Sequence, residues 1–133
     1  MKAKELLQTA AQSSVMIKTH KSAIDDFENQ LEQLKSIGGD TSEITTKIRA
    51  TQDKMKDEVS RLAELQTAAF NLIMLLQNEK QKAVLFKHYL EGKTIEQIAD
   101  ELYLTIRHCY RLQRWAFEEL DNSQKAAEIL SLF

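Results

Sequence analysis

The stretch TIEQIADELYLTIRHCYRLQRW, residues 94–115, decides the fold that we expect for the C-terminal half of this chain. Apolar residues recur at helical spacing on both sides of a short interruption, which predicts two helices joined by a turn. Six small or apolar residues occupy the positions at which the helices of a helix-turn-helix contact each other: Ile98, Ala99, Leu102, Leu104, Cys109 and Leu112. Thr94 and Thr105 stand where N-caps are expected, so the stretch predicts a helix-turn-helix whose second helix runs to residue 120.

The turn itself departs from the usual pattern at Tyr103. Many such motifs have glycine here because the backbone takes a positive φ angle, which a tyrosine adopts only at some cost. We therefore expect backbone strain or a different turn at this position. Before the motif, Asn78 and Gln81 predict a capping box for a compact helix that ends near Gly92.

Two long helical stripes precede this region. The first covers residues 3–37 at alternating steps of three and four: Leu6, Ala10, Ser13, Ile17, His20, Ile24, Phe27, Leu31 and Leu34. The second covers residues 42–76 in the same way: Ile44, Ile48, Thr51, Met55, Leu62, Leu65, Ala69, Leu72 and Leu76. Gly38 and Gly39 lie between them and predict a chain reversal. We expect an antiparallel helical hairpin with arms about 50 Å long, at about 1.5 Å per residue.

Composition agrees with an all-α fold, because the 133 residues include no proline and only three glycines. We expect a helical hairpin over residues 1–77, a helix-turn-helix domain over 78–121, and a short amphipathic tail over 122–133 that folds back onto this domain. A two-helix hairpin buries only one stripe per helix, so we expect a homodimer formed through the N-terminal helices. Residues 68–76 are apolar almost all round, which predicts that the hairpin meets the second domain there.

Positive charge gathers on the second helix of the helix-turn-helix, although the whole chain carries a net charge of −2. Arg107, Arg111 and Arg114 recur at steps of four and three, and no acidic residue lies between Thr105 and Phe117. The side of this helix that we expect to be buried consists of Ile106, Cys109, Leu112, Ala116 and Leu120. A merely solvated face is one interpretation of the three arginines. The six-residue helix-turn-helix pattern beneath them favours a second interpretation, in which the helix inserts into the major groove of duplex DNA.

The position of each residue on such a helix predicts the contact that it makes. Base-reading candidates lie in its first turns: Arg107, Tyr110 and Arg111. Phosphate-contacting candidates accompany them: Thr105, His108 and Arg114. Lys93 is a further candidate for the DNA backbone, which it would reach from the preceding turn.

Other kinds of chemistry find little support in the sequence. Cys109 is the single cysteine, and His20, His88 and His108 are too far apart to suggest a metal site, so we expect neither a disulfide nor a metal. No glycine-rich phosphate loop and no nucleophile with an obvious base are present, and we expect neither an enzyme nor a cofactor. No apolar run is long enough to span a membrane and no secretory signal is present, which predicts a cytoplasmic protein.

The run HYLEGKTIEQIADELYLTIRHCYRLQRWAFEEL, residues 88–120, resembles the fourth-region helix-turn-helix of bacterial sigma factors. It is more similar still to the sigma-like late transcription regulators that phages and prophages of Gram-positive bacteria encode. The resemblance covers residues 76–120 and rests on six residues: Tyr89, Ile98, Ala99, Tyr110, Arg111 and Leu112. Cys109 and Trp115 replace residues more typical of sigma factors. The resemblance implies a sequence-specific regulator that binds duplex promoter DNA and contacts the host RNA polymerase.

Two alternatives to a DNA-binding transcriptional regulator stay open. A DNA-packaging recognition subunit also joins a helix-turn-helix to oligomerising helices, and its mass in solution would be that of a ring of many subunits. A coiled-coil adaptor would use the helix-turn-helix to dock a protein and would not bind DNA.

Overall fold

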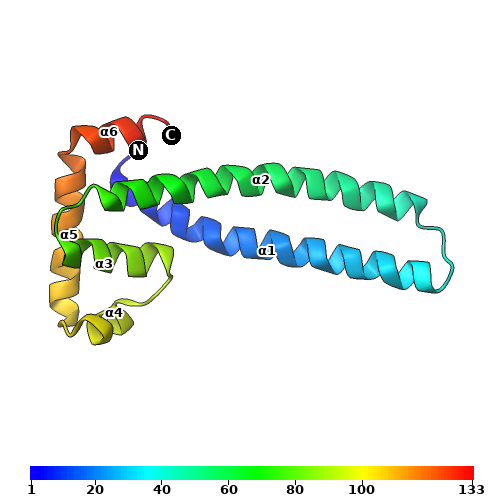
Figure 1. Cartoon of the computed structure of the whole chain (residues 1–133), viewed down its shortest axis with the longest axis horizontal. Helices are drawn as coiled ribbons and strands as arrows, with labels where there is room; N and C mark the ends of the chain where they lie inside the picture. The colour runs from blue at the N-terminus through cyan, green and yellow to red at the C-terminus, as the bar shows by residue number, and fades with distance from the viewer. The chain divides into compact units, whose positions relative to one another are not determined.

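The computed structural model describes all residues from 1 to 133 and contains helices and connecting turns but no strand. Its elements, labelled in Figure 1 apart from the short π-helix η1, are α1 (Ala3–Ser36), α2 (Ser42–Met74), α3 (Glu79–Leu85), η1 (Phe86–Leu90), α4 (Ile95–Leu102), α5 (Ile106–Asp121) and α6 (Gln124–Leu130). The expected all-α fold is confirmed. None of these helices is both long enough and apolar enough to cross a lipid bilayer. The chain forms two compact units, residues 14–63 and residues 1–13 with 64–133, and α1 and α2 contribute to both.

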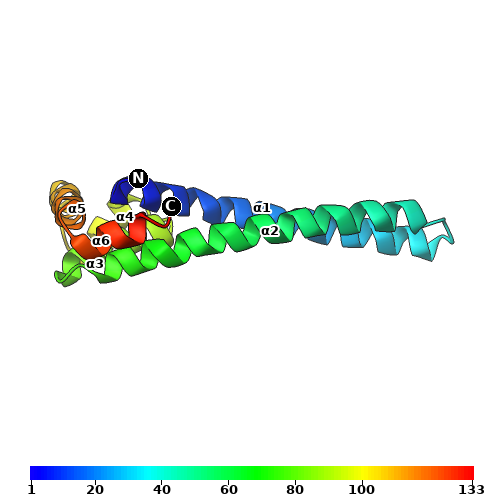
Figure 2. The ribbon, with the colours of Figure 1, turned by 90° about the horizontal axis from the view of Figure 1, so that it is seen from above.

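The unit of residues 14–63 is an antiparallel pair of helices closed by a short turn (Figure 2). Helix α1 ends at Ser36, and Gly38 follows it with a φ of +73°, which a glycine adopts without steric cost. Asp40 then accepts hydrogen bonds from the backbone nitrogen of Ser42 at 3.0 Å and from its hydroxyl at 2.8 Å. These two bonds lower the pKa of Asp40, the backbone bond most. The predicted chain reversal is confirmed.

The apolar stripes of this unit face each other but stay thinly covered. Ile48 and Leu62 are its only buried side chains. The other stripe residues are half-buried: Ile17, His20, Ile24, Phe27, Leu31, Leu34, Ile44, Thr51 and Met55. Two helices alone bury a single strip between them, so both flanks of each stripe remain accessible.

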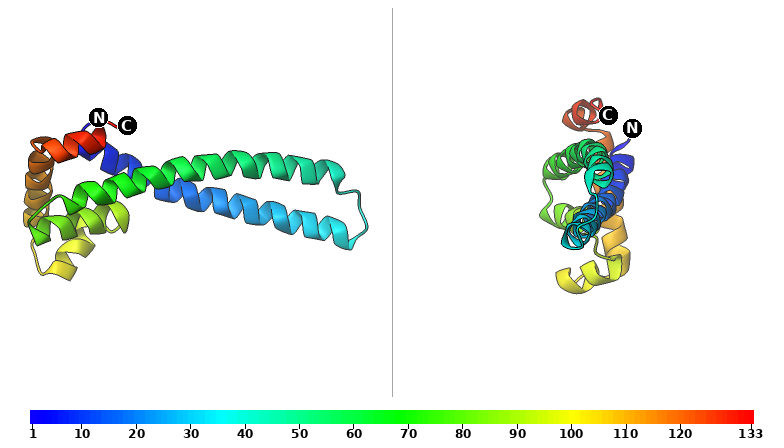
Figure 3. Two further views of the ribbon diagram at one scale, coloured as in Figure 1. Left: turned by 45° about the horizontal axis from the view of Figure 1, so that its top comes forward. Right: turned by 90° about the vertical axis from the view of Figure 1, so that its right-hand side faces the viewer.

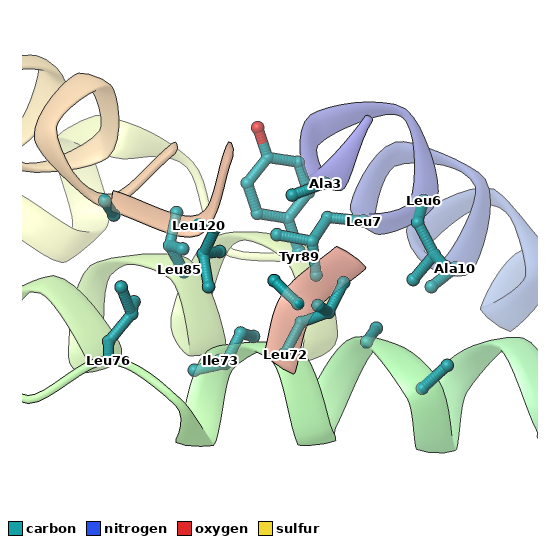
Figure 4. Packing of buried hydrophobic residues seen from close by; sticks show 14 residues of the cluster. Ala3, Leu6, Leu7, Ala10, Leu72, Ile73, Leu76, Leu85, Tyr89 and Leu120 are labelled. Atoms are coloured by element: carbon teal, nitrogen blue, oxygen red, sulfur yellow. The ribbon is translucent and has the colours of Figure 1, made fainter. Parts of the chain in front are cut away.

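The second unit is built around an apolar cluster to which the first turns of α1 and the last turns of α2 contribute (Figure 4). Leu6 and Leu7 of α1 are fully buried against residues of α2, of the segment that follows it, and of α3, η1 and α5: Leu72, Ile73, Leu76, Leu85, Tyr89 and Leu120. The expected contact of residues 68–76 with the C-terminal part is confirmed. The compact unit is therefore larger than the segment 78–121, because this apolar end of α2 packs on several helices at once.

Helix α6 continues this cluster at the end of the chain. Ala126 is fully buried in it, and Ile129 and Leu130 pack against it while half-buried. The last two residues are left out of the packing, with Leu132 79% exposed and Phe133 45% exposed. The expected fold-back of the tail is thus confirmed as far as Leu130.

The capping box predicted at the start of α3 is only half formed. The Asn78 side chain accepts a hydrogen bond from the Gln81 backbone nitrogen at 3.0 Å, as expected. The reciprocal bond is missing, because Gln81 Oε1 is buried and has no partner. After Leu85 the helix widens into η1, where the Glu91 nitrogen donates to the Phe86 carbonyl at 3.1 Å, and Gly92 ends it with a φ of +73°.

Candidate nucleic-acid interface

A second apolar cluster lies between α4 and α5. Figure 3 shows these two helices, coloured yellow and orange, joined by a short turn as in a helix-turn-helix. The cluster contains all six residues that the sequence predicted at the contact between the two helices. Four are buried, namely Ile98, Ala99, Cys109 and Leu112, and two are half-buried, namely Leu102 and Leu104. Val84 of α3 and Ile95 of α4 complete the cluster. Cys109 is fully buried, and this burial raises the pKa of its thiol, as expected for a packing residue rather than a nucleophile.

The turn between α4 and α5 has the left-handed backbone that the motif usually gives to glycine. Tyr103 adopts φ 56° and ψ 42°, and the Leu104 nitrogen donates to the Ala99 carbonyl at 2.9 Å. This conformation costs a non-glycine residue on the order of 1 kcal/mol. The tyrosine side chain is 95% exposed and makes no contact that would offset this cost. The strain expected at Tyr103 is confirmed, and the turn keeps its usual geometry.

Both helices of the motif begin at the predicted threonines. Thr94 forms a complete capping box, in which its nitrogen donates to Gln97 Oε1 at 2.9 Å and its hydroxyl accepts from the Gln97 nitrogen at 3.2 Å. Thr105 accepts from the His108 nitrogen at 3.1 Å. The first turn of α5, which carries Arg107, is therefore fixed by its own cap.

One exposed side of α5 carries the predicted cationic residues. Arg107, Tyr110, Arg111 and Arg114 line a shared concavity, which we call the arginine face. The opposite side is buried through Cys109, Leu112, Ala116 and Leu120. Ile106 was expected on the buried side and is instead 44% exposed, because it lies in the first turn beyond the reach of the cluster.

The arginine face is not neutralised within the protein. Arg107 and Arg111 form no ion pair, and the nearest carboxylate to Arg114 is Glu118, with Oε1 4.0 Å from Nε and both side chains about two-thirds exposed. Like charges three or four residues apart destabilise a helix by about 0.2–0.5 kcal/mol per pair. A positive charge in the first turn, as at Arg107, is also unfavourable at the positive end of the helix dipole. An anionic ligand would relieve both effects.

Lys93, which was predicted to reach the DNA backbone, lies in a different electrostatic environment. Its ammonium is 2.7 Å from Glu101 Oε1 and 3.2 Å from Glu91 Oε2, and Lys87 lies 3.0 Å from the other oxygen of Glu101. Hydrogen bonds to Glu101 and Glu91 raise the pKa of Lys93, and those from Lys93 and Lys87 lower the pKa of Glu101. These ion pairs already occupy the Lys93 ammonium, and we therefore leave Lys93 out of the proposed set of DNA contacts.

The two remaining candidates flank the arginine face. Thr105 is exposed, and its hydroxyl keeps a proton to donate after accepting the cap hydrogen bond. His108 is half-buried, with its ring 6.2 Å from that of Trp115 in an edge-to-face arrangement. Both residues therefore border the face without being part of its concavity.

A second groove adjoins the arginine face and was not predicted. It shares Tyr110 and Arg114 with that face and adds polar residues from α1, η1 and α5: Lys4, Gln8, Tyr89, Gln113 and Glu118. No local pattern could reveal this groove, because the first turns of α1 reach α5 only through the tertiary packing of the cluster in Figure 4.

No group of three or more His, Cys, Asp or Glu side chains is placed to hold a metal ion. Comparison of the chain with protein-family models, with curated proteins and with solved structures gives no match. The geometry and charge of α5 are therefore the basis on which we propose a function.

Proposed function

We propose that this protein is a non-enzymatic transcriptional regulator that binds duplex DNA by inserting α5 into the major groove. The observation that carries the proposal is the arginine face, three guanidinium groups and a phenol on one exposed side of a rigidly held helix. Its charges lack intramolecular partners apart from the distant Glu118 contact. A groove that presents phosphates and base-edge acceptors matches a surface of this kind.

Different members of the face are suited to different parts of the duplex. Arg107 and Arg111 have planar forks that can bind two guanine acceptors at once, and Tyr110 lies between them in sequence with its side chain 55% exposed. Arg114, Thr105 and His108 are suited to phosphate oxygens. This division predicts that sequence preference depends on the first turns of α5.

We propose further that two copies of the chain associate through the hairpin of residues 14–63. The half-buried stripes support this, as does an apolar groove lined by Phe27, Ile44 and Ile48 within the same unit. A second hairpin would cover these flanks, and two recognition helices would double the DNA contacts. Sedimentation equilibrium tests this directly: a dimer is expected, a monomer would contradict it, and a large ring would favour a DNA-packaging subunit.

The resemblance to sigma-like phage and prophage regulators supports a cytoplasmic role in bacterial transcription, with contact to the host RNA polymerase. Pulldown with purified bacterial polymerase tests this contact separately from DNA binding. A chain that retains a protein partner but binds no duplex at low salt would be an adaptor instead.

The decisive experiment measures duplex binding by fluorescence anisotropy over a range of salt concentrations. The double variant Arg107→Ala/Arg111→Ala is expected to bind more weakly, because two base-reading side chains are lost. Its salt dependence should also be flatter, because two positive charges leave the interface with the DNA, and each phosphate no longer neutralised reduces the logarithmic slope by about 0.9. Arg49→Ala is the matched control, because Arg49 is an exposed arginine of the hairpin unit. Unchanged affinity and slope in the double variant would contradict the proposal.

A further inference from the structure

The groove beside the arginine face contains hydrogen-bond donors that the fold leaves unused. Tyr89 is 8% exposed, and its ring packs edge-to-face on Phe117 at 5.9 Å within the apolar cluster. Its hydroxyl points away from the aliphatic side chains of that cluster (Figure 4) and has no hydrogen-bond partner in the protein. Gln113 Nε2 is buried and also has no partner. A buried donor without a partner, such as Gln113 Nε2, costs about 1–3 kcal/mol. The Tyr89 hydroxyl lines the same groove and is free to donate, so the groove suits a ligand that accepts hydrogen bonds.

The charged groups of the groove indicate the sign of that ligand. Lys4 and Arg114 bring positive charge from α1 and α5, and Gln8 and Tyr110 add further donors. Glu118 is the one acidic residue that lines the groove, and it lies at the 4.0 Å limit of an ion pair with Arg114. An oxyanion with several acceptor oxygens, such as a phosphate group, fits this set of donors.

The groove is continuous with the proposed DNA-binding surface, since Tyr110 and Arg114 line both. Phosphates of a duplex border the major groove on either side of an inserted helix, and contacts to them set the register of the protein on the DNA. A phosphate beside α5 would therefore lie within reach of the first turns of α1.

We propose that this groove binds a backbone phosphate of the duplex, with Lys4, Tyr89 and Gln113 as positioning residues that fix the angle at which α5 enters the major groove. The proposal rests on the proposed function and extends the DNA-contacting surface to the first helix of the chain. It assigns a hydroxyl that works at the surface to Tyr89, whose ring packs in the apolar cluster.

Three variants test the proposal in duplex binding at several salt concentrations. Lys4→Gln is expected to reduce the logarithmic salt slope by about 0.9, because it removes one phosphate contact made by a cation. Tyr89→Phe is expected to weaken binding by about tenfold without changing the slope, since only an uncharged donor is lost. Lys2→Gln is the matched control, because Lys2 is an exposed lysine two residues away that lines a different groove.

The outcomes separate this inference from the proposed function. Wild-type binding by Lys4→Gln and Tyr89→Phe, together with lost binding by Arg107→Ala/Arg111→Ala, would overturn the inference and leave the proposed function standing. Unchanged binding by all of these variants would overturn both. An equal loss of slope in Lys2→Gln would also contradict the inference, because it would reveal a diffuse charge effect. Circular dichroism melts of Tyr89→Phe check that the hydroxyl contributes nothing to folding.

A second readout distinguishes a duplex phosphate from a free anion. Nuclear magnetic resonance is used to follow the Gln113 side-chain amide during titration with a short duplex and with inorganic phosphate at matched ionic strength. We expect the amide to shift with the duplex and not with inorganic phosphate. An equal shift with inorganic phosphate alone would identify a free-anion site and contradict our assignment.

Discussion

Two cationic clusters lie close together in the sequence around the helix-turn-helix, and they have opposite electrostatic surroundings. Lys87 and Lys93 are held within 3.2 Å of the carboxylates of Glu91 and Glu101. The arginine face has no carboxylate closer than 4.0 Å. The number of positive charges in the sequence does not distinguish the two clusters, and both contain candidates for DNA contact. The difference teaches that a cation near a motif is available to a ligand only where the fold has not already paired it.

The largest expected effect comes from reversing charge on the arginine face. Arg107→Glu/Arg111→Glu should weaken duplex binding roughly 1,000-fold, about 4 kcal/mol, through lost contacts and new repulsion from phosphates. The melting temperature should stay the same or rise, because the like-charge pairs disappear and acids suit the start of a helix. Anisotropy and thermal melts measure the two quantities. If binding survives, the arginine face is a solvated surface and the comparison fails.

The next largest effect tests the apolar cluster between α4 and α5, which holds the helix that carries the arginine face. Ile98→Ala removes a fully buried side chain from the cluster between α4 and α5 and should lower the free energy of unfolding by about 2–5 kcal/mol. Urea denaturation measures this loss. Ile37→Ala, at a residue that is 79% exposed, serves as the control and should change stability little. A small effect at Ile98 would mean that this cluster does not hold the two helices together.

A smaller change in stability, of opposite sign, is expected at the turn between α4 and α5. Tyr103→Gly relieves the left-handed strain and should raise the free energy of unfolding by up to about 1 kcal/mol, reduced by the greater freedom of glycine in the unfolded chain. Denaturation at equilibrium again provides the measurement. A destabilised variant would show that the exposed phenol makes a contact that stabilises the fold.

The smallest effect concerns the paired lysines and depends on pH. Glu101 has a pKa lowered by Lys93 and Lys87, so its pairing stabilises the fold fully above the ordinary glutamate pKa and is lost as the pH falls through the lowered value. Glu101→Gln should therefore melt slightly below wild type at neutral pH, and this gap should close in acid. Lys93→Gln should leave duplex binding unchanged. Weaker binding by Lys93→Gln would return this lysine to the contact set.

Much of the molecule follows from patterns within single segments. Helical periodicity and the two glycines predict both arms of the hairpin, and the threonine caps at Thr94 and Thr105 form as expected. The arginine face is predicted equally well, because residues three and four apart share one side of any helix. These features depend only on neighbours in the chain, which the sequence displays directly.

Other features arise only when distant segments meet. The pairing of Lys93 with Glu101 closes a gap of eight residues across a turn, and the groove of Lys4, Tyr89 and Gln113 joins three helical segments. Tertiary packing also leaves Ile106 exposed and Gln81 without its capping bond. The sequence by itself therefore determined which residues share a helical face, because that depends on backbone geometry alone. Only the tertiary structure decided which charges are neutralised and which donors remain unused, because those depend on contacts between segments that no local period encodes.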